Sequence, residues 1–96
     1  MRCLSVLALL VACTWAPAAL ADGAALYAAN CSSCHGDDGK AGTPVGKAMK
    51  VPSLAGSAPS LDKVKATVRE NAKHKAVSGK VGDAELETIA EYMKSL

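Results

Sequence analysis

The sequence predicts an all-α domain over residues 22–96, and three observations support this class. Two segments late in the chain carry apolar residues at helical spacing, an alanine-rich segment precedes them, and no segment shows the sustained alternation of apolar β-branched residues that marks a strand. The chain contains no Phe and only two Tyr. A domain this short and this poor in aromatic residues needs a disulfide, a metal or a large cofactor to complete its core.

Residues 1–21 have the pattern of a secretory signal peptide. Arg2 gives a positive start, residues 4–11 are apolar, and an Ala-x-Ala cleavage signal ends at Ala21. We expect cleavage after Ala21 and a domain that is exported to the periplasm. The apolar run is too short to span a bilayer, so we expect no membrane span.

A lipid anchor at Cys13 stays an alternative, because residues 10–13, Leu-Val-Ala-Cys, resemble a lipobox. The residues that follow are apolar and lack the polar tether expected of a lipoprotein. If the signal peptide is removed as expected, Cys3 and Cys13 are lost with it. Cys31 and Cys34 are then the only cysteines of the mature chain.

The charges of the expected domain nearly balance. The chain has eleven Lys and Arg against nine Asp and Glu, and Arg2 is the only one of them within residues 1–21, so ten basic and nine acidic residues remain. No basic cluster is interleaved with aromatic residues, as a nucleic-acid surface would require. We expect no nucleic-acid partner and a monomeric domain.

The first helix is expected from Gly23 toward Cys34, with Asp22 as its N-cap. The two cysteines would then lie at the C-terminal end of this helix. Residues 36–56 contain five Gly and two Pro, a density that predicts a long loop without regular structure. Loops of this length in a compact domain usually have a function.

Two more helices are expected in the second half of the chain. One begins after Pro59 with Ser60 as N-cap and ends near Ala72. The last begins after Gly82 with Asp83 as N-cap, and its apolar residues recur at i, i+3, i+4 and i+7. That apolar face consists of Leu86, Ile89, Ala90 and Met93.

Residues 31–35, Cys-Ser-Ser-Cys-His, form a C-x-x-C-H motif. Two thiols one helical turn apart reach the two vinyl groups on one edge of a haem, and the adjacent histidine then stands below the iron. The motif therefore predicts one covalently attached haem c, with thioethers from Cys31 and Cys34 and with His35 as the proximal axial ligand. A buried haem would also supply the missing apolar volume of the core.

Three other interpretations fit this motif less well. A thioredoxin-like redox pair follows a strand in a βαβ unit, and no strand is expected before Cys31. A structural disulfide needs neither His35 nor a glycine-rich loop. A zinc site needs four ligands, whereas the expected domain has only two cysteines and two histidines as N or S donors, and adjacent residues 34 and 35 would chelate one ion poorly.

Beyond the motif, residues 22–96 resemble a small bacterial class I cytochrome c over their whole length. Gly23 and Tyr27 lie four apart ahead of the cysteines, as in the N-terminal helix of that family, and residues 89–92, Ile-Ala-Glu-Tyr, resemble its C-terminal helix. The resemblance implies three to four short helices wrapped around the haem, with these two helices crossing near right angles. Gly23 would permit their close approach, and Tyr92 would cover the crossing.

The same resemblance assigns a role to Pro44, which follows His35 by nine residues. In the family, a proline in this loop has a backbone carbonyl that accepts a hydrogen bond from the proximal imidazole. Such a bond fixes the orientation of the ring and raises the basicity of the ligand. An ordinary loop proline is the alternative.

The family usually binds the far side of the iron with a methionine ahead of the final helix. Here the Gly-Lys-apolar-x-Asp run of residues 79–83 fixes the register and places His74 where that methionine is expected. Met49 in the glycine-rich loop is the rival ligand, an open sixth position is a further alternative, and His74 is otherwise an exposed histidine between two lysines. Because methionine raises the reduction potential and a second imidazole lacks that effect, we expect a bis-histidine haem of low potential.

Together these features predict a one-electron carrier and not an enzyme. Redox partner proteins are the expected partners, and scattered lysines supply either a docking surface for an acidic partner or merely a solvated face. Those lysines are Lys40, Lys47, Lys50, Lys63, Lys65, Lys73, Lys75 and Lys80.

Three other functions are alternatives to that of an electron carrier. A haem-based sensor or ligand-binding domain with a displaceable sixth ligand is the main alternative, and rapid binding of carbon monoxide would favour it. A minimal peroxidase is disfavoured, because Arg69 is the only arginine of the expected domain and no Arg/His pair is placed to assist peroxide cleavage. A detached subunit that resembles the cytochrome domain of a larger oxidoreductase stays open.

Overall fold

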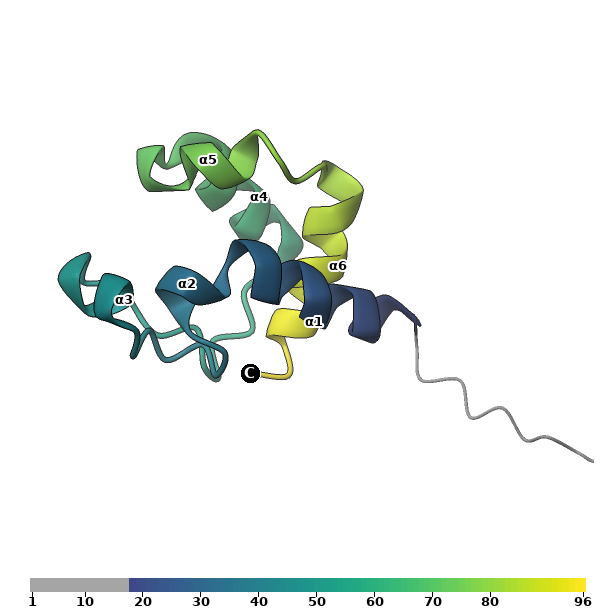
Figure 1. Ribbon diagram of the computed structural model, residues 1–96. Helices are drawn as coiled ribbons and strands as arrows, with labels where there is room; N and C mark the ends of the chain where they lie inside the picture. The colour runs from purple at the N-terminus through teal and green to yellow at the C-terminus, as the bar shows by residue number, and fades with distance from the viewer. Residues whose placement is uncertain (1–17) are drawn as a thin grey trace, which may run out of the picture.

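The computed structural model describes residues 18–96, with side chains from Asp22 onward. Residues 1–17, which hold Cys13 and most of the expected signal peptide, lie outside the described residues. The described part consists of helices, turns and loops and contains no strand, which confirms the predicted all-α class (Figure 1). Its elements are α1 (Ala18–Asn30), α2 (Ser32–His35), α3 (Pro44–Ala48), α4 (Leu61–Glu70), the 3₁₀ helix η1 (Ala72–His74), α5 (Lys75–Ser78) and α6 (Asp83–Met93).

The first and last long helices, α1 and α6, pack against each other (Figure 1), and Gly23 lies at their contact. A Cβ atom on Gly23 would lie 2.7 Å from the carbonyl oxygen of Thr88 and 2.8 Å from Cβ of Tyr92, so only glycine allows this approach. The ring of Tyr92 packs beside that of Tyr27, with centroids 5.4 Å apart and planes tilted by 52°. The expected roles of Gly23 and Tyr92 at this crossing are therefore confirmed.

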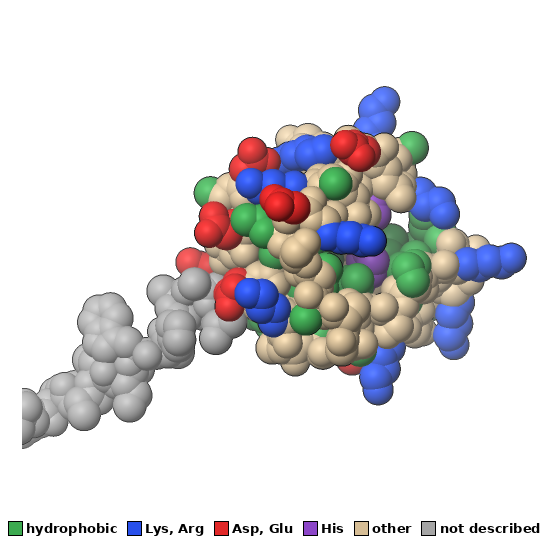
Figure 2. Space-filling view, turned by 180° about the vertical axis from the view of Figure 1, so that it is seen from behind, with side chains coloured by type: hydrophobic (Ala, Val, Ile, Leu, Met, Phe, Trp, Pro, Cys, Tyr) green, Lys and Arg blue, Asp and Glu red, His purple; other side chains and the backbone are tan. Residues whose placement is uncertain are grey.

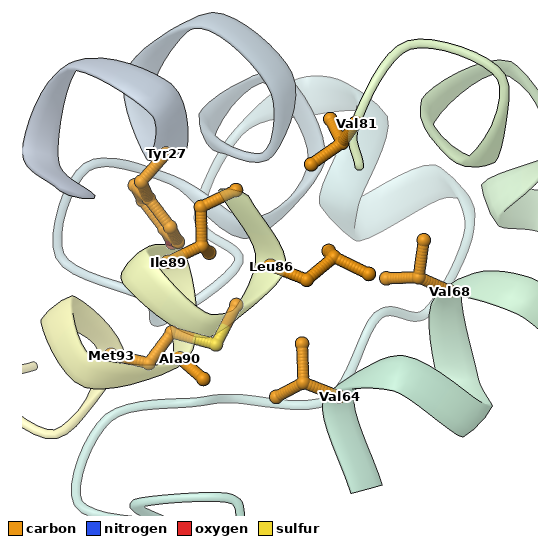
Figure 3. Packing of buried hydrophobic residues seen from close by; sticks show 8 residues of the cluster. All are labelled: Tyr27, Val64, Val68, Val81, Leu86, Ile89, Ala90 and Met93. Atoms are coloured by element: carbon orange, nitrogen blue, oxygen red, sulfur yellow. The ribbon is translucent and has the colours of Figure 1, made fainter. Parts of the chain in front are cut away.

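The core lies between α1, α4 and α6 (Figure 3). Each residue of the predicted apolar face of α6 is buried, and Ile89 at its centre is 0% exposed. Burial of one large aliphatic side chain stabilises the fold by about 1.5–3 kcal/mol. The buried cluster consists of Tyr27, Val64, Val68, Val81, Leu86, Ile89, Ala90 and Met93.

The beginning and the end of α1 differ from the prediction. The helix begins at Ala18, so Asp22 is an exposed residue within it and not its N-cap. The residues before Asp22 are good helix formers, and they extend the helix past the cap signal. At the other end α1 stops at Asn30, Cys31 lies in a turn, and Cys34 belongs to the separate helix α2.

The caps of the two later helices follow the sequence more closely. The hydroxyl of Ser60 accepts a hydrogen bond from the backbone N–H of Lys63 at 3.2 Å, which confirms the predicted N-cap of α4. Helix α4 ends at Glu70, before Ala72, because the next residue is extended. The N-cap of α6 is Gly82 and not Asp83, which is the first residue of the helix.

The expected loop over residues 36–56 contains one short helix, α3. Thr43 caps this helix with its side chain, and Pro44 occupies the first turn, where its fixed φ angle suits a helix start. Five residues are too few to show an apolar periodicity, so the Thr-Pro pair is the only feature of the sequence that indicates α3. None of the helices in residues 18–96 has both the length and the apolarity needed to cross a membrane.

Candidate functional site

The C-x-x-C-H motif occupies one compact turn after α1. The backbone N–H of His35 donates to the carbonyl of Cys31 at 3.0 Å, and that of Cys31 donates to the carbonyl of Tyr27 at 2.8 Å. The two cysteines are therefore one helical turn apart, and their thiols are not joined in a disulfide. Burial raises the pKa of the Cys31 thiol to about 11, so the unreacted thiol is neutral at physiological pH.

Helix α3 packs directly on this motif. The hydroxyl of Thr43 donates to the carbonyl of Ser33 at 2.8 Å and accepts from the backbone N–H of Gly46 at 3.0 Å. Gly46 is buried, and a Cβ atom at this position would overlap the carbonyl oxygen of Cys34 and lie 2.7 Å from that of Ala41. The roles of Thr43 and Gly46 are not predictable from the sequence, because they arise only where α2 and α3 meet.

Two further bonds fix the chain as it leaves the motif. The backbone N–H of Ala41 donates to the carbonyl of His35 at 2.7 Å. The hydroxyl of Tyr27 donates to the carbonyl of Gly36 at 2.7 Å, and this bond is buried. The same burial raises the pKa of Tyr27 to about 12, so the phenol stays a donor at physiological pH.

The motif forms one wall of a cavity of about 590 Å³. Cys31, Cys34 and His35 line it, and so does His74 from the segment between α4 and α6. Figure 2 shows the two histidines inside this hollow, with lysine side chains around its rim. The remaining wall is largely apolar and includes Val51, Leu54, Val64, Val68, Leu86, Ile89 and Met93.

His35 and His74 face each other with their ring centroids 6.1 Å apart and their planes inclined by only 18°. Metal–imidazole bonds are about 2.0–2.1 Å long, and the centre of each five-membered ring lies beyond its ligating nitrogen, so the ring centres of a bis-histidine site stand about 6 Å apart. The spacing of the two ring centres therefore matches that expected of a bis-histidine site.

The environment of the two histidines also favours the neutral form of their imidazole rings. Burial lowers the pKa of both rings, and the neighbouring charge of His74 lowers that of His35 further. The neutral imidazole is the form that binds a metal. On each ring Nδ1 is buried without a hydrogen-bond partner.

The hydrogen bond expected from His35 to the carbonyl of Pro44 is not formed, because Nδ1 of His35 has no partner. Pro44 lies in the first turn of α3, where backbone carbonyls point along the helix toward the N–H groups four residues on. Pro44 instead starts the helix that packs on the motif.

The rival ligand, Met49, lines the same cavity and is 36% exposed at the end of α3. The ring that stands opposite His35 is that of His74. Within residues 18–96, no three His, Cys, Asp or Glu side chains converge in the way that a metal-ion cluster requires. A metal that is already held by a planar cofactor needs only two more ligands from the protein, and a pair of histidines can supply them.

The cavity and its lining fit a haem. Its volume lies within the range of about 300–1,000 Å³ that is usual for cofactor pockets, and its walls are mostly apolar. Two thiols stand at one edge beside the first histidine, and the second histidine faces the first across the space. The residues can therefore attach the cofactor at its edge and bind its metal from both sides.

The model of the family described as Cytochrome C oxidase, cbb3-type, subunit III matches residues 18–93, nearly all of the described chain. No curated protein and no solved structure matches the chain.

Proposed function

We propose that this chain, which belongs to the cytochrome c family whose model it matches, is an exported carrier of single electrons with one bis-histidine haem c of low potential. Membership of the family implies an electron carrier with covalently bound haem c. The single haem, its two axial histidines, the low potential and the periplasmic location are the finer parts of the proposal.

The facing rings of His35 and His74 are the observation that carries the proposal. We assign the thioether bonds to Cys31 and Cys34 and the two axial positions to the histidines. When bound, the haem supplies an iron that takes up and releases one electron. The chain holds the cofactor covalently, keeps both axial ligands neutral, and shields it from water with aliphatic side chains, which tunes the potential.

Lysines at the mouth of the cavity support docking of an acidic redox partner at this face. Lys50, Lys63 and Lys73 line the cavity, and Figure 2 shows acidic side chains gathered away from its rim. Opposite charges on two partners speed their encounter, and salt screens that attraction. We expect electron transfer with such a partner to slow as the ionic strength rises.

A second candidate function is that of a haem subunit within a larger oxidoreductase. The description of the matched family, which names an oxidase subunit, favours it. The size of the native protein distinguishes the two functions. Gel filtration of an extract from the source organism places a diffusible carrier near its monomer mass, whereas a subunit elutes with its complex.

Visible and NMR spectra of the holoprotein, made with a cytochrome maturation system, test the ligation. We expect a six-coordinate low-spin haem without the NMR signals of an iron-bound methionine. His74→Ala should lose the low-spin spectrum, and Met49→Leu, the matched control for the rival ligand, should keep it. A low-spin spectrum that survives His74→Ala would refute the bis-histidine assignment.

Intact mass of the same preparation tests the export and attachment. We expect a chain that begins at Asp22 and carries one covalently bound haem. A chain that begins at a lipidated Cys13 would contradict the expected cleavage after Ala21. Cys31→Ser and Cys34→Ser should each lose one thioether bond without changing the site of cleavage.

A further inference from the structure

The only arginine of residues 22–96, Arg69, makes four hydrogen bonds from the C-terminal end of α4. One guanidinium nitrogen donates to the carbonyl of Ser78 at 2.6 Å and to its hydroxyl at 3.2 Å. The other donates to the carbonyl of Val81 at 2.7 Å and to the carboxylate of Asp83 at 3.1 Å. Arg69 thus connects α4, the end of α5 and the start of α6.

The segment between these contacts, residues 70–80, contains His74, and we call it the His74 loop. Its own hydrogen bonds are local, such as the one from the backbone N–H of His74 to the carbonyl of Asn71 at 2.9 Å. Most of its residues are exposed, with Val77 packed at the edge of the core. Among the described residues, the side-chain hydrogen bonds that join this loop to the rest of the protein all come from Arg69.

Segments with few buried contacts and mostly local hydrogen bonds open most readily. Closing the loop of residues 70–80 costs conformational entropy, which contacts at its base must offset. The guanidinium provides these contacts with a planar fork of donors, a geometry that the ammonium of lysine cannot reproduce. Arg69 does not line the cavity, so any effect on the iron passes through the loop.

We propose that Arg69 is a positioning residue that holds the His74 loop closed and thereby sets how often His74 leaves the iron. The inference rests on the proposed function, because it takes His74 as the sixth ligand. The four contacts of Arg69 close the base of the loop. Their loss lets the loop swing outward and breaks the bond between the iron and the His74 nitrogen more often.

Carbon monoxide binding to the reduced holoprotein measures this opening. At saturating carbon monoxide the bond from the iron to His74 must break before the gas binds, so the observed rate reports how often the loop opens. Arg69→Met should raise this rate about tenfold, and Arg69→Lys should raise it by a smaller factor, since it restores the charge but not the fork. Lys94→Met, which also removes a cation and an ion pair, should leave it unchanged.

Hydrogen exchange distinguishes a positioning role from a general loss of stability. In Arg69→Met we expect faster exchange in residues 70–80 and unchanged exchange in α1 and α6. Faster exchange throughout the protein would overturn the inference. If Arg69→Met fails to incorporate haem, carbon monoxide binding and hydrogen exchange are measured on Arg69→Lys instead. A carbon monoxide binding rate equal to that of the wild type then overturns the inference.

His74→Ala separates this inference from the proposed function. If it binds carbon monoxide much faster than the wild type while Arg69→Met does not differ from the wild type, His74 is the ligand and the role of Arg69 is wrong. If His74→Ala binds as slowly as the wild type, His74 is not the displaced ligand, and the ligation and the inference fail together. Fast binding in both variants, with slow binding in Lys94→Met, supports the inference.

Discussion

The hydroxyl of Tyr27 in α1 donates a buried 2.7 Å hydrogen bond to the carbonyl of Gly36, the residue that directly follows the motif histidine. Tyr27→Phe keeps the packing of the ring and leaves this carbonyl without its partner. We expect the free energy of unfolding to fall by about 1–3 kcal/mol, as for other buried groups that lose a hydrogen bond. Guanidinium unfolding of the holoprotein measures the change, and equal midpoints for the two proteins would contradict the prediction.

The same tyrosine predicts a loss of stability at alkaline pH. Burial raises the pKa of Tyr27 from 10.0 to about 12, so the folded state favours the neutral phenol. This contribution is fully present below pH 10 and is lost as the pH rises toward 12, because only the unfolded chain then ionises readily. A two-unit shift corresponds to about 2–3 kcal/mol. The difference in unfolding free energy between wild type and Tyr27→Phe should therefore shrink by this amount between pH 9 and pH 12.

The two proteins differ at one residue, so contributions to stability that they share cancel in the difference. A difference that stays constant up to pH 12 would show that the phenol is not held in its neutral form.

Gly46→Ala should loosen the contact between α3 and the C-x-x-C-H motif. The added methyl group would overlap the carbonyl of Cys34, so α3 must move away from α2. Forced repacking of this kind costs about 1–3 kcal/mol. Thermal or guanidinium unfolding of the holoprotein measures the cost, and the yield of covalent haem reports whether the motif still presents its thiols.

Gly42→Ala is the matched control in the same loop. Nothing lies within 4 Å of a Cβ atom at Gly42, so we expect a change within about 0.5 kcal/mol. If Gly42→Ala and Gly46→Ala destabilise the protein equally, the contact with Cys34 is not the cause.

The parts of the fold that the sequence predicts well are those with strong local signals. In α6, four apolar residues at helical spacing were enough to identify the buried face, and Ser60 marked the start of α4. The short helices α3 and α5 are not predictable in this way, because four or five residues cannot display a period of 3.6. The start of α1 differs from the prediction, because the helix propensity of residues 18–21 outweighs the cap signal of Asp22.

The residues of the candidate site likewise differ in whether the sequence can predict them. Cys31, Cys34 and His35 follow from one contiguous motif, and His74 follows from the resemblance to class I cytochromes c, in which the run of residues 79–83 fixes the register. Gly46 and Arg69 contact backbone carbonyls outside their own helices. Every residue has a backbone carbonyl, so residue types do not indicate which carbonyl a side chain contacts. These contacts are therefore visible only in the structure.

His74→Met should raise the reduction potential of the holoprotein. Methionine ligation favours the reduced iron relative to a second imidazole, and axial ligands as a group set haem potentials over about 0.8 V, so we expect a rise on the order of 0.1 V. A redox titration followed in the visible spectrum gives the potential, and the NMR signals of an iron-bound methionine show whether the new side chain has reached the iron. Met49→Leu added to this variant tests whether those signals come from position 74, because they should persist unchanged. A potential equal to that of the wild type, with the methionine signals present, would mean that His74 does not keep the potential low.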